Sequence, residues 1–332
     1  MSRPTPLLGP LLQAFFAEHL LAHKQASPQT VAAYRDAFRL LLLFLRETKA
    51  LEPAALRLDD VGAPQLLCFL EHLETHRGNT ARSRNARLAA FRSFFRFVTL
   101  REPDSLALAS SVLAIPVRRV TRPLVGYLSR PEMDAILAAP DCATWAGRRD
   151  HALLLTLYNS GARVSEIARL QRAQVDVGAT ACVRLHGKGR RDRAVPLWPK
   201  TAKVLRAWFR ELGPGDGLAF PNARGRPLTR DGVAYLLDRA NQAACSHCPS
   251  LKDKRVSPHV IRHTTAMHLL QAGVDLTVIA LWLGHESIET THGYLEADLA
   301  TKQRALAKLS PTTTTVPRFR PTDELLGFLA AL

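Results

Sequence analysis

The sequence predicts a mainly α-helical fold in two domains, with one small antiparallel sheet in the second domain. Apolar residues recur at helical spacing through the first 105 residues, whereas alternation of apolar and polar residues is confined to residues 175–196. Residues 106–124 show no clear period and are rich in serine, proline and valine, as expected for a linker. The length of 332 residues accommodates about two domains.

The first predicted domain, residues 1–105, is expected to contain helices only. Ser27 and Pro28 mark a helix start, because serine caps a helix N-terminus and proline suits its first turn. The apolar face of this helix is formed by Val31, Tyr34, Phe38, Leu41, Leu42 and Leu45. We expect further helices at residues 11–23, 64–76 and 80–99.

The helix predicted at residues 80–99 is unusually basic. Residues 77–101 contain seven arginines and no acidic residue. A solvated helix face is the alternative interpretation, but such faces usually mix charges to gain stabilising pairs one turn apart. A phosphate backbone explains an all-arginine face better. We therefore predict DNA contacts from Arg82, Arg84, Arg87, Arg92 and Arg96.

The whole chain is strongly basic, with a net charge of +16 and a pI of about 10.3. Residues 1–122 carry 17 basic and 10 acidic residues (+7), and the remainder carries 28 and 19 (+9). Two basic domains on a basic linker predict a clamp around a DNA duplex. No apolar run approaches the roughly 18 residues of a membrane span, and we expect a cytoplasmic, nucleoid-associated protein.

The second predicted domain, residues 125–310, begins with the capping pattern Ser129-Arg-Pro-Glu. Residues 175–196 are predicted to form the antiparallel sheet, interrupted by a turn at residues 187–190. We expect helices at residues 148–158, 164–170, 200–212, 229–244, 257–272, 275–283 and 287–309. Residues 311–332 form a predicted tail, whose residues 323–332 are expected to form a short amphipathic helix.

Several polar residues of the second domain suit chemistry on a phosphodiester. His259 and Arg262 lie one turn apart at the start of a helix capped by Ser257, where the positive helix end also attracts anions. Arg163 stands at another predicted helix start. His285 follows the glycine that ends a helix, and Tyr294 follows nine residues later. Guanidiniums can bind phosphate oxygens, imidazoles can move protons, and a tyrosine hydroxyl can act as nucleophile.

The order of these residues resembles the tyrosine recombinase (phage integrase) family. The resemblance covers about residues 125–310 and rests on Arg163, Lys188, the His259-x-x-Arg262 motif, Leu283-Gly284-His285 and Thr291-x-x-Tyr294. Residues 1–105 resemble the family's SAM-like core-binding domain in pattern and charge only. The layout is similar to that of the two-domain Xer-like or transposon-borne members.

The resemblance implies a role for each matching residue. Tyr294 attacks the scissile phosphate to form a 3′-phosphotyrosyl link, and Arg163 and Arg262 hold the nonbridging oxygens. Lys188 protonates the leaving 5′ oxygen, with Arg190, Arg191 and Arg193 as local alternatives, and Arg190 is also expected to contact DNA. His259 accepts the tyrosine proton, His285 hydrogen-bonds the phosphate, and Glu166 steadies the pocket. The resemblance further implies that no metal or cofactor is needed. It implies a homotetramer on two duplexes as the working form, with sister recombinases as further partners.

Three other functions are compatible with parts of the sequence. A type IB topoisomerase shares the tyrosine and the arginines but acts as a monomer, and a non-catalytic DNA-binding accessory protein would need none of them. Cys245-x2-Cys248 followed by His259-x3-His263 superficially matches a zinc site, although the interval is short and no ββα pattern surrounds it.

The remaining cysteines and the tail allow simpler expectations. Cys68, Cys142 and Cys182 lie in apolar patterns and are predicted to be core residues, and five cysteines in all are too few for a disulfide framework. The apolar residues of segment 323–332 require a place to bury. That place is either the chain's own catalytic domain or, as the resemblance favours, a neighbouring subunit.

Overall fold

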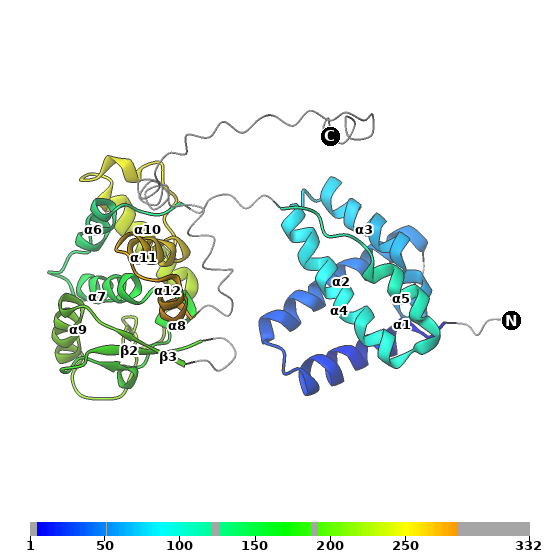
Figure 1. Ribbon diagram of the computed structural model, residues 1–332, viewed down its shortest axis with the longest axis horizontal. Coiled ribbons are helices and arrows are strands. Elements are labelled where there is room, and N and C mark those ends of the chain that lie inside the picture. Colours follow the sequence, from blue (N-terminus) through cyan, green and yellow to red (C-terminus); the bar gives the residue numbers. More distant parts are fainter. Residues whose placement is uncertain (1–4, 51, 121–125, 188–191, 285–332) are drawn as a thin grey trace, which may run out of the picture. The chain divides into compact units, whose positions relative to one another are not determined.

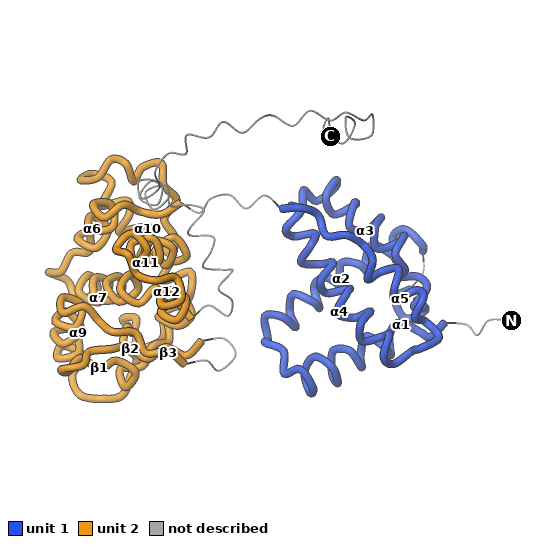
Figure 2. The backbone as a smooth tube through the Cα atoms, viewed as in Figure 1, with its two compact units in different colours: residues 1–122 blue, residues 123–332 orange. Residues whose placement is uncertain are grey.

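The computed structural model describes residues 5–50, 52–120, 126–187 and 192–284. The chain divides into two compact units, Met1–Arg122 and Pro123–Leu332 (Figure 2). The predicted fold class is confirmed, because the first unit is helical and the second combines helices with a small antiparallel sheet. Within the described ranges, no helix combines the length and apolar character needed to cross a membrane.

Unit 1 is built entirely from helices in the part that the structure describes (Figure 1). Helix α1 continues into a π-helical segment, Phe15–His23, and Ser27 caps α2 by accepting from the backbone N–H of Thr30. The elements are α1 (Leu8–Ala14), α2 (Pro28–Lys49), α3 (Ala63–Thr75), α4 (Ala81–Arg101) and α5 (Leu106–Leu113).

Aromatic side chains form the centre of unit 1. Phe38 of α2 packs edge-to-face on Phe91 and Phe94 of α4, with ring centroids 5.2 and 5.3 Å apart. Phe15 packs against Phe94 in the same manner. Edge-to-face pairs add to the stabilisation that burial of the rings provides. The phenylalanines of α4 therefore form the face by which this basic helix packs into the core.

The prediction that residues 106–124 form a linker is wrong for residues 106–113. Residues 106–113 form helix α5, which packs on α4 and buries Ala109 and Val112, and Ile115 just beyond it is also buried. Six of the eight residues of this segment are apolar, so no polar face marks a helical period in the sequence. Their burial against α4 decides the structure.

Unit 2 combines helices with a three-stranded antiparallel sheet, which lies at one edge of the unit (Figure 1). Its helices are α6 (Arg130–Ala138), α7 (Trp145–Ser160), α8 (Val164–Ile167), α9 (Pro199–Leu212), α10 (Arg230–Ala244), α11 (Pro258–Gln271) and α12 (Leu276–Leu283). Its strands are β1 (Val175–Asp176), β2 (Cys182–His186) and β3 (Asp192–Pro196), in the order β1-β2-β3. Val183 pairs with Val195 and His186 with Asp192, so β2 and β3 flank the turn predicted at residues 187–190.

Helix α7 runs through the interior of unit 2 and packs on α11. Its buried hydroxyl groups are satisfied locally, since Thr156 donates to the carbonyl of Ala152 and Ser160 to that of Thr156. Thr265 of α11 donates to the carbonyl of Tyr158 at 2.6 Å. These bonds fix the carboxyl end of α7 against α11, where the candidate site lies.

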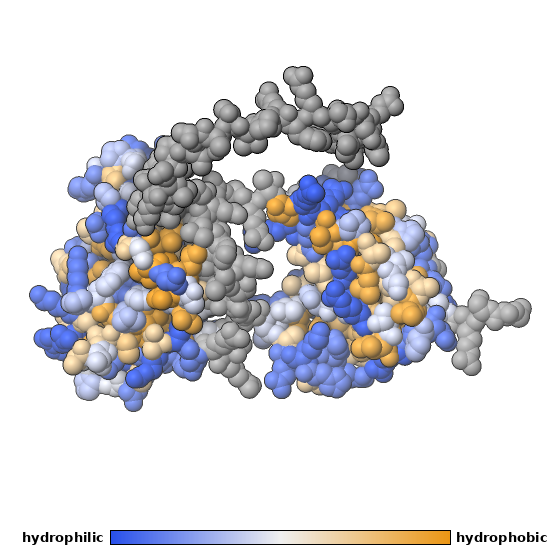
Figure 3. All heavy atoms as spheres, in the orientation of Figure 1, coloured by the Kyte–Doolittle hydropathy of each residue, from blue (hydrophilic) through white to orange (hydrophobic). Residues whose placement is uncertain are grey.

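The prediction that Cys68, Cys142 and Cys182 are core residues is wrong. Cys68 and Cys142 are exposed, and Cys182 is only half-buried. Cys68 lies on α3, whose buried face is formed instead by Leu66, Phe69, Leu70 and Leu73. Figure 3 shows hydrophobic residues at the surface of both units, so an apolar pattern does not by itself place a residue in the core.

Candidate active site

Three arginines bind the carboxyl end of α12. Arg193 donates to the carbonyl of Trp282 at 3.0 Å, Arg262 to that of Leu283 at 2.6 Å, and Arg163 to that of Gly284 at 3.0 Å. The last carbonyls of a helix have no partner within the helix and carry partial negative charge, so cations are favourable there. The predicted site residues Arg163 and Arg262 are therefore brought together.

Arg262 links the ends of two helices. It lies in the first half of α11, which Ser257 caps and Pro258 begins. Its Nη1 donates to the carbonyl of Gly161 at 2.7 Å while its Nη2 binds Leu283. The residue is buried, at 5% exposure. A guanidinium carries five N–H donors in one plane, so a single side chain can join both helix ends.

Arg163 and Glu166 form the turn that begins α8. Glu166 accepts from the backbone N–H of Arg163 at 2.8 Å and from its Nη1 at 3.0 Å. Burial alone would raise the pKa of Glu166, but the hydrogen bonds and charge of Arg193 and Arg163 outweigh it and hold that pKa below its usual value. Glu166 is therefore an anion at neutral pH, which agrees with its predicted supporting role. The side chain of Arg163 stays 36% exposed and can reach a ligand.

Two glycines allow these helix ends to meet. Gly161 and Gly284 both have left-handed backbones, with φ of +58° and +65°. A Cβ on Gly161 would lie 2.5 Å from Cδ2 of Leu283, which is closer than packed atoms approach. The positive φ ends α7 and α12, and the close approach brings the two ends within reach of Arg262.

His259 pairs with the histidine one turn further along α11. The Nε2 atoms of His259 and His263 are 2.8 Å apart, and their rings meet edge-to-face. Burial, together with the positive charges of His259 and Arg262, lowers the pKa of His263 to about 4. His263 is therefore neutral at neutral pH, and a hydrogen bond joins the two Nε2 atoms, with the donor set by the ring tautomers. His259 itself is exposed at the helix start.

The zinc interpretation is wrong. Cys245 and Cys248 lie partly buried against the hydrophobic core of unit 2, whereas His259 and His263 bond to each other. Across residues 5–50, 52–120, 126–187 and 192–284, no three His, Cys, Asp or Glu side chains gather as a metal site would require. Sequence spacing alone produced the match.

Four predicted site residues lie outside the described residues, as do the alternative Arg191, the predicted helix at residues 287–309 and the predicted tail at residues 311–332. Lys188 and Arg190 belong to the turn between β2 and β3, and His285 and Tyr294 follow the end of α12. The structure does describe the positions that flank them. His186 and Asp192 bond to each other at 2.5 Å at the base of the turn, and Gly284 precedes His285 directly. The roles of these four residues stay predictions.

Comparison with known proteins identifies the family. The model of the phage integrase family matches residues 127–300, and that of the phage integrase N-terminal SAM-like domain matches residues 13–102. The chain belongs to the phage integrase family of tyrosine recombinases. It is 51% identical to the putative integrase/recombinase y4rC of Sinorhizobium fredii, with 98% of each chain covered.

Two further comparisons agree with this assignment. The recombinase is 31% identical to the tyrosine recombinase XerC of Pelobacter propionicus, over 93% of this chain and 98% of the relative. Its fold is similar to that of the XerH site-specific recombinase, whose structure is a post-cleavage complex with a palindromic difH substrate. That match has a TM-score of 0.68 and 21% identity, and it covers 86% of this chain and 81% of the other. The chain is a tyrosine-type site-specific recombinase.

The arginines predicted to contact DNA fall into two groups in the recombinase. Arg82 and Arg96 are exposed on α4, and Arg87 is half-buried. Arg84 is buried, at 5% exposure, with its guanidinium beside Glu74 and bonded to the carbonyl of Pro116. Arg92 donates to the carbonyls of Leu113 and Ile115. The predicted DNA contacts therefore do not fit Arg84 and Arg92, whose charges hold the chain after α5 instead.

Arg193 is a site residue that the sequence analysis named only as an alternative to Lys188. It donates from both Nη atoms to Glu166, at 3.1 and 2.7 Å. One signal was present in the sequence, because alternation places Arg193 on the same face of β3 as the buried Val195. A charged residue on a buried strand face needs an ionic partner, which Glu166 provides.

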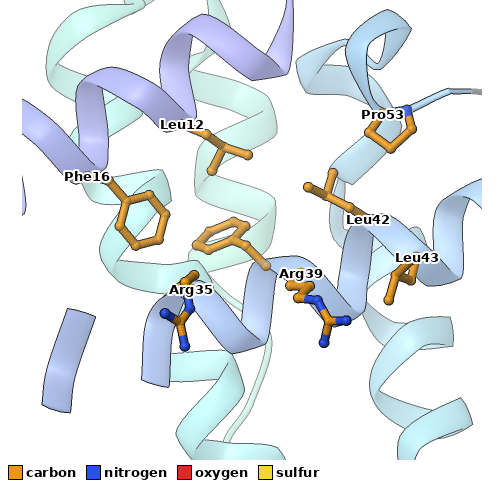
Figure 4. Close-up of a pocket in the computed structure, with 8 residues that line it drawn as sticks. Leu12, Phe16, Arg35, Arg39, Leu42, Leu43 and Pro53 are labelled. Atoms are coloured by element: carbon orange, nitrogen blue, oxygen red, sulfur yellow. The ribbon is translucent and has the colours of Figure 1, made fainter. Parts of the chain in front are cut away.

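A separate apolar groove in unit 1 carries none of this chemistry. Figure 4 shows Leu12 of α1 and Phe16 of the π-helical segment Phe15–His23 facing Leu42 of α2, with Arg35 and Arg39 on successive turns of α2. The groove has a volume of about 290 Å³ and its walls expose only apolar surface. It contains no acid, base or nucleophile.

Proposed function

We propose that the recombinase cuts a DNA strand by attack of Tyr294 on a phosphodiester. The bond from the tyrosine oxygen to phosphorus forms as the bond to the 5′ oxygen breaks, which gives a 3′-phosphotyrosyl link and a free 5′-hydroxyl. The bond energy is retained in this link, so the reverse reaction with another 5′-hydroxyl rejoins the strand. One observation carries the proposal: Arg163 and Arg262 bind the last two residues of the segment that leads directly to His285.

The charges of the site support phosphate binding. Arg163, Arg193 and Arg262 bring three positive charges to the end of α12, where the carboxylate of Glu166 pairs with Arg163 and Arg193. The surplus of positive charge suits the negative charge that develops on the two nonbridging oxygens. Because the arginines are held by backbone carbonyls and by Glu166, little reorganisation is needed when the phosphate enters.

Proton transfers complete the proposed reaction. His259, at the exposed start of α11, takes the phenolic proton of Tyr294. Lys188 donates a proton to the leaving 5′ oxygen, and His285 hydrogen-bonds the phosphate. Rejoining runs through the same transfers in reverse.

We further propose that the partner is a specific double-stranded DNA site and that strand exchange uses a homotetramer on two duplexes, with sister recombinases as further partners. The DNA-bound form of XerH and the net charge of +16 support a DNA partner. The recombinase would act in the cytoplasm, at the nucleoid. The topoisomerase and accessory-protein alternatives are not favoured, because the relatives compared above are integrases and recombinases matched over nearly their full length.

The test uses DNA duplexes that the wild-type protein selects by binding from a randomised pool. These duplexes are then nicked at successive positions across the region that the protein protects. A nick at the right position should trap the covalent intermediate. We expect a protein–DNA adduct that survives denaturation with wild type and none with Tyr294→Phe, while both bind the duplex equally. Absence of any adduct with wild type would contradict the proposal. Relaxation of supercoils by dilute protein, without joined products from two duplexes, would favour the topoisomerase.

A further inference from the structure

Arg193 connects three elements of unit 2 through one side chain. It lies on β3, shortly after the turn that contains Lys188. Its Nη atoms bind both oxygens of Glu166 at the start of α8, and its Nε donates to the carbonyl of Trp282 at the end of α12. Its side chain and that of Glu166 are 9% and 5% exposed. The ion pair is therefore enclosed, and both charges depend on it.

We propose that Arg193 is a positioning residue for strand cleavage. It holds the β2–β3 hairpin, and thus the turn with Lys188, against the end of α12, from which the chain continues to His285 and Tyr294. The inference rests on the proposed function, in which those residues act on the same phosphate. Arg193 touches no substrate in this scheme and acts through the groups that it holds.

The contact at Gly284 shows how closely the strand and the helix end are packed. A Cβ on Gly284 would lie 3.1 Å from both Cδ and Nη1 of Arg193, tighter than most packed Cβ atoms. The guanidinium thus lies directly against the helix terminus. Any shift of the hairpin relative to α12 must break the bond to Trp282 or the paired bonds to Glu166.

Arg193 also keeps Arg163 available for phosphate. Glu166 is ionised, and Arg193 binds both of its oxygens while Arg163 binds one. Without Arg193, the charge of this buried carboxylate is left to Arg163, which already bonds it. Its positive charge is then offset by Glu166 rather than by a phosphate. Lysine in place of Arg193 retains the positive charge. Its single ammonium group cannot bind both oxygens of Glu166 and the carbonyl of Trp282 with the same geometry.

The experiment compares Arg193→Met, Arg193→Lys and the double variant Arg193→Met/Glu166→Gln with wild type, using the selected nicked duplex described above. Arg184→Met is the matched control, because Arg184 lies exposed on the adjacent strand β2 and its loss changes the net charge equally. Three quantities are measured on the full chain: duplex affinity, single-turnover rate of adduct formation, and hydrogen exchange of the peptide covering residues 276–284.

We expect Arg193→Met to lower the rate of adduct formation about 100-fold, as displacement of catalytic groups by about 1 Å does. Duplex affinity should stay within a few fold of wild type, and exchange at residues 276–284 should accelerate. Arg193→Lys should give an intermediate rate, and the double variant should be faster than Arg193→Met because no unpaired carboxylate competes for Arg163. Arg184→Met should match wild type in rate and exchange.

Two results would overturn the inference. One is adduct formation by Arg193→Met at nearly the wild-type rate, with an adduct in wild type that depends on Tyr294. The other is a fall in affinity and rate together, with no rescue by Arg193→Lys, which indicates a general loss of folding. If wild type itself forms no adduct, the proposed function fails and this inference fails with it.

Discussion

The side chain of Asn85 on α4 makes two hydrogen bonds with the backbone of Arg118. Its side-chain amide donates to the carbonyl of Arg118 at 2.8 Å and accepts from the N–H of Arg118 at 3.0 Å. The side chain of Arg118 turns to Glu74 of α3, at 3.0 Å. The segment that follows α5 is thus attached to α4 as far as Arg118, within residues that the sequence predicted to be a linker.

Removal of this attachment should expose the connection to protease. We expect Asn85→Ala to increase trypsin cleavage after Arg118 and Arg119 several-fold, because two hydrogen bonds to the backbone are lost. The expected loss of stability is about 1–2 kcal/mol, from two bonds of ordinary strength. Limited proteolysis with mass analysis of the fragments measures the change. Ser93→Ala on the same helix is the control, and equal cleavage in both variants would refute the attachment.

The arginines of α4 should separate into two experimental classes. Arg82→Gln and Arg96→Gln should each weaken duplex binding and reduce the salt slope by about one counterion, if each side chain contacts a phosphate. Arg92→Gln should instead lower the melting temperature, because it bonds the carbonyls of Leu113 and Ile115. Binding titrations at several salt concentrations and thermal unfolding distinguish the classes. A salt slope unchanged in Arg82→Gln would remove that residue from the interface.

The sequence predicted the helices and the sheet of this protein well because their signals are local. Capping residues such as Ser27 and Ser129 and the alternation around Val183 act within one turn or one strand. The partners of Arg84, Arg92 and Arg193 are not local. A basic residue whose partner lies far along the chain looks the same in sequence as one that faces solvent or DNA.

The candidate site was predictable only in part for the same reason. Residue types and order placed Arg163 and Arg262 together, and the structure agrees. Both arginines bind backbone carbonyls at the end of α12. This arrangement results from the packing of α7, α11 and α12, which a short sequence motif cannot predict. Burial of Arg193 was indicated only by its strand face.

His268 should make folding stability depend on pH. Burial, followed by the charge of Arg130, lowers the pKa of His268 to about 4, although its contact with the Leu128 backbone and the charge of Asp134 raise it. Its Nδ1 lies 2.7 Å from the hydroxyl of the buried Tyr158. Since the folded pKa lies below the ordinary value of about 6.5, the stabilising contribution is complete above pH 6.5. It is lost as the pH falls towards 4.

The expected loss over this range is on the order of 2–3 kcal/mol. Urea unfolding of wild type and His268→Gln at intervals between pH 7 and 4 measures it, and the difference between the two slopes isolates His268 from the other titrating groups. Identical slopes would show that His268 keeps an ordinary pKa in the folded protein.

Gly161 offers a test of the contact between α7 and α12. Gly161→Ala should cost about 1 kcal/mol or more for a left-handed backbone and a further amount to displace Leu283, whose Cδ2 would lie 2.5 Å from the new Cβ. Gly273→Ala is the matched control, because Gly273 also has a positive φ, of +84°, but no atom within 4 Å of its Cβ position. Urea unfolding should show the larger loss for Gly161→Ala. Equal losses would mean that Leu283 moves aside at no cost.

The two arginines that we propose to bind the phosphate, Arg163 and Arg262, should respond differently to lysine. Arg163→Lys should leave the melting temperature and duplex affinity near wild type but lower adduct formation about 100-fold or more, because a half-exposed guanidinium is lost at the phosphate. Arg262→Lys should lower both the rate and the melting temperature, since the buried guanidinium also joins the carbonyls of Gly161 and Leu283. Single-turnover assays and thermal unfolding of both variants test this. An Arg262→Lys protein as stable as wild type would show that its two carbonyl contacts contribute little to the fold, and the packing of α7 against α12 would then need another cause.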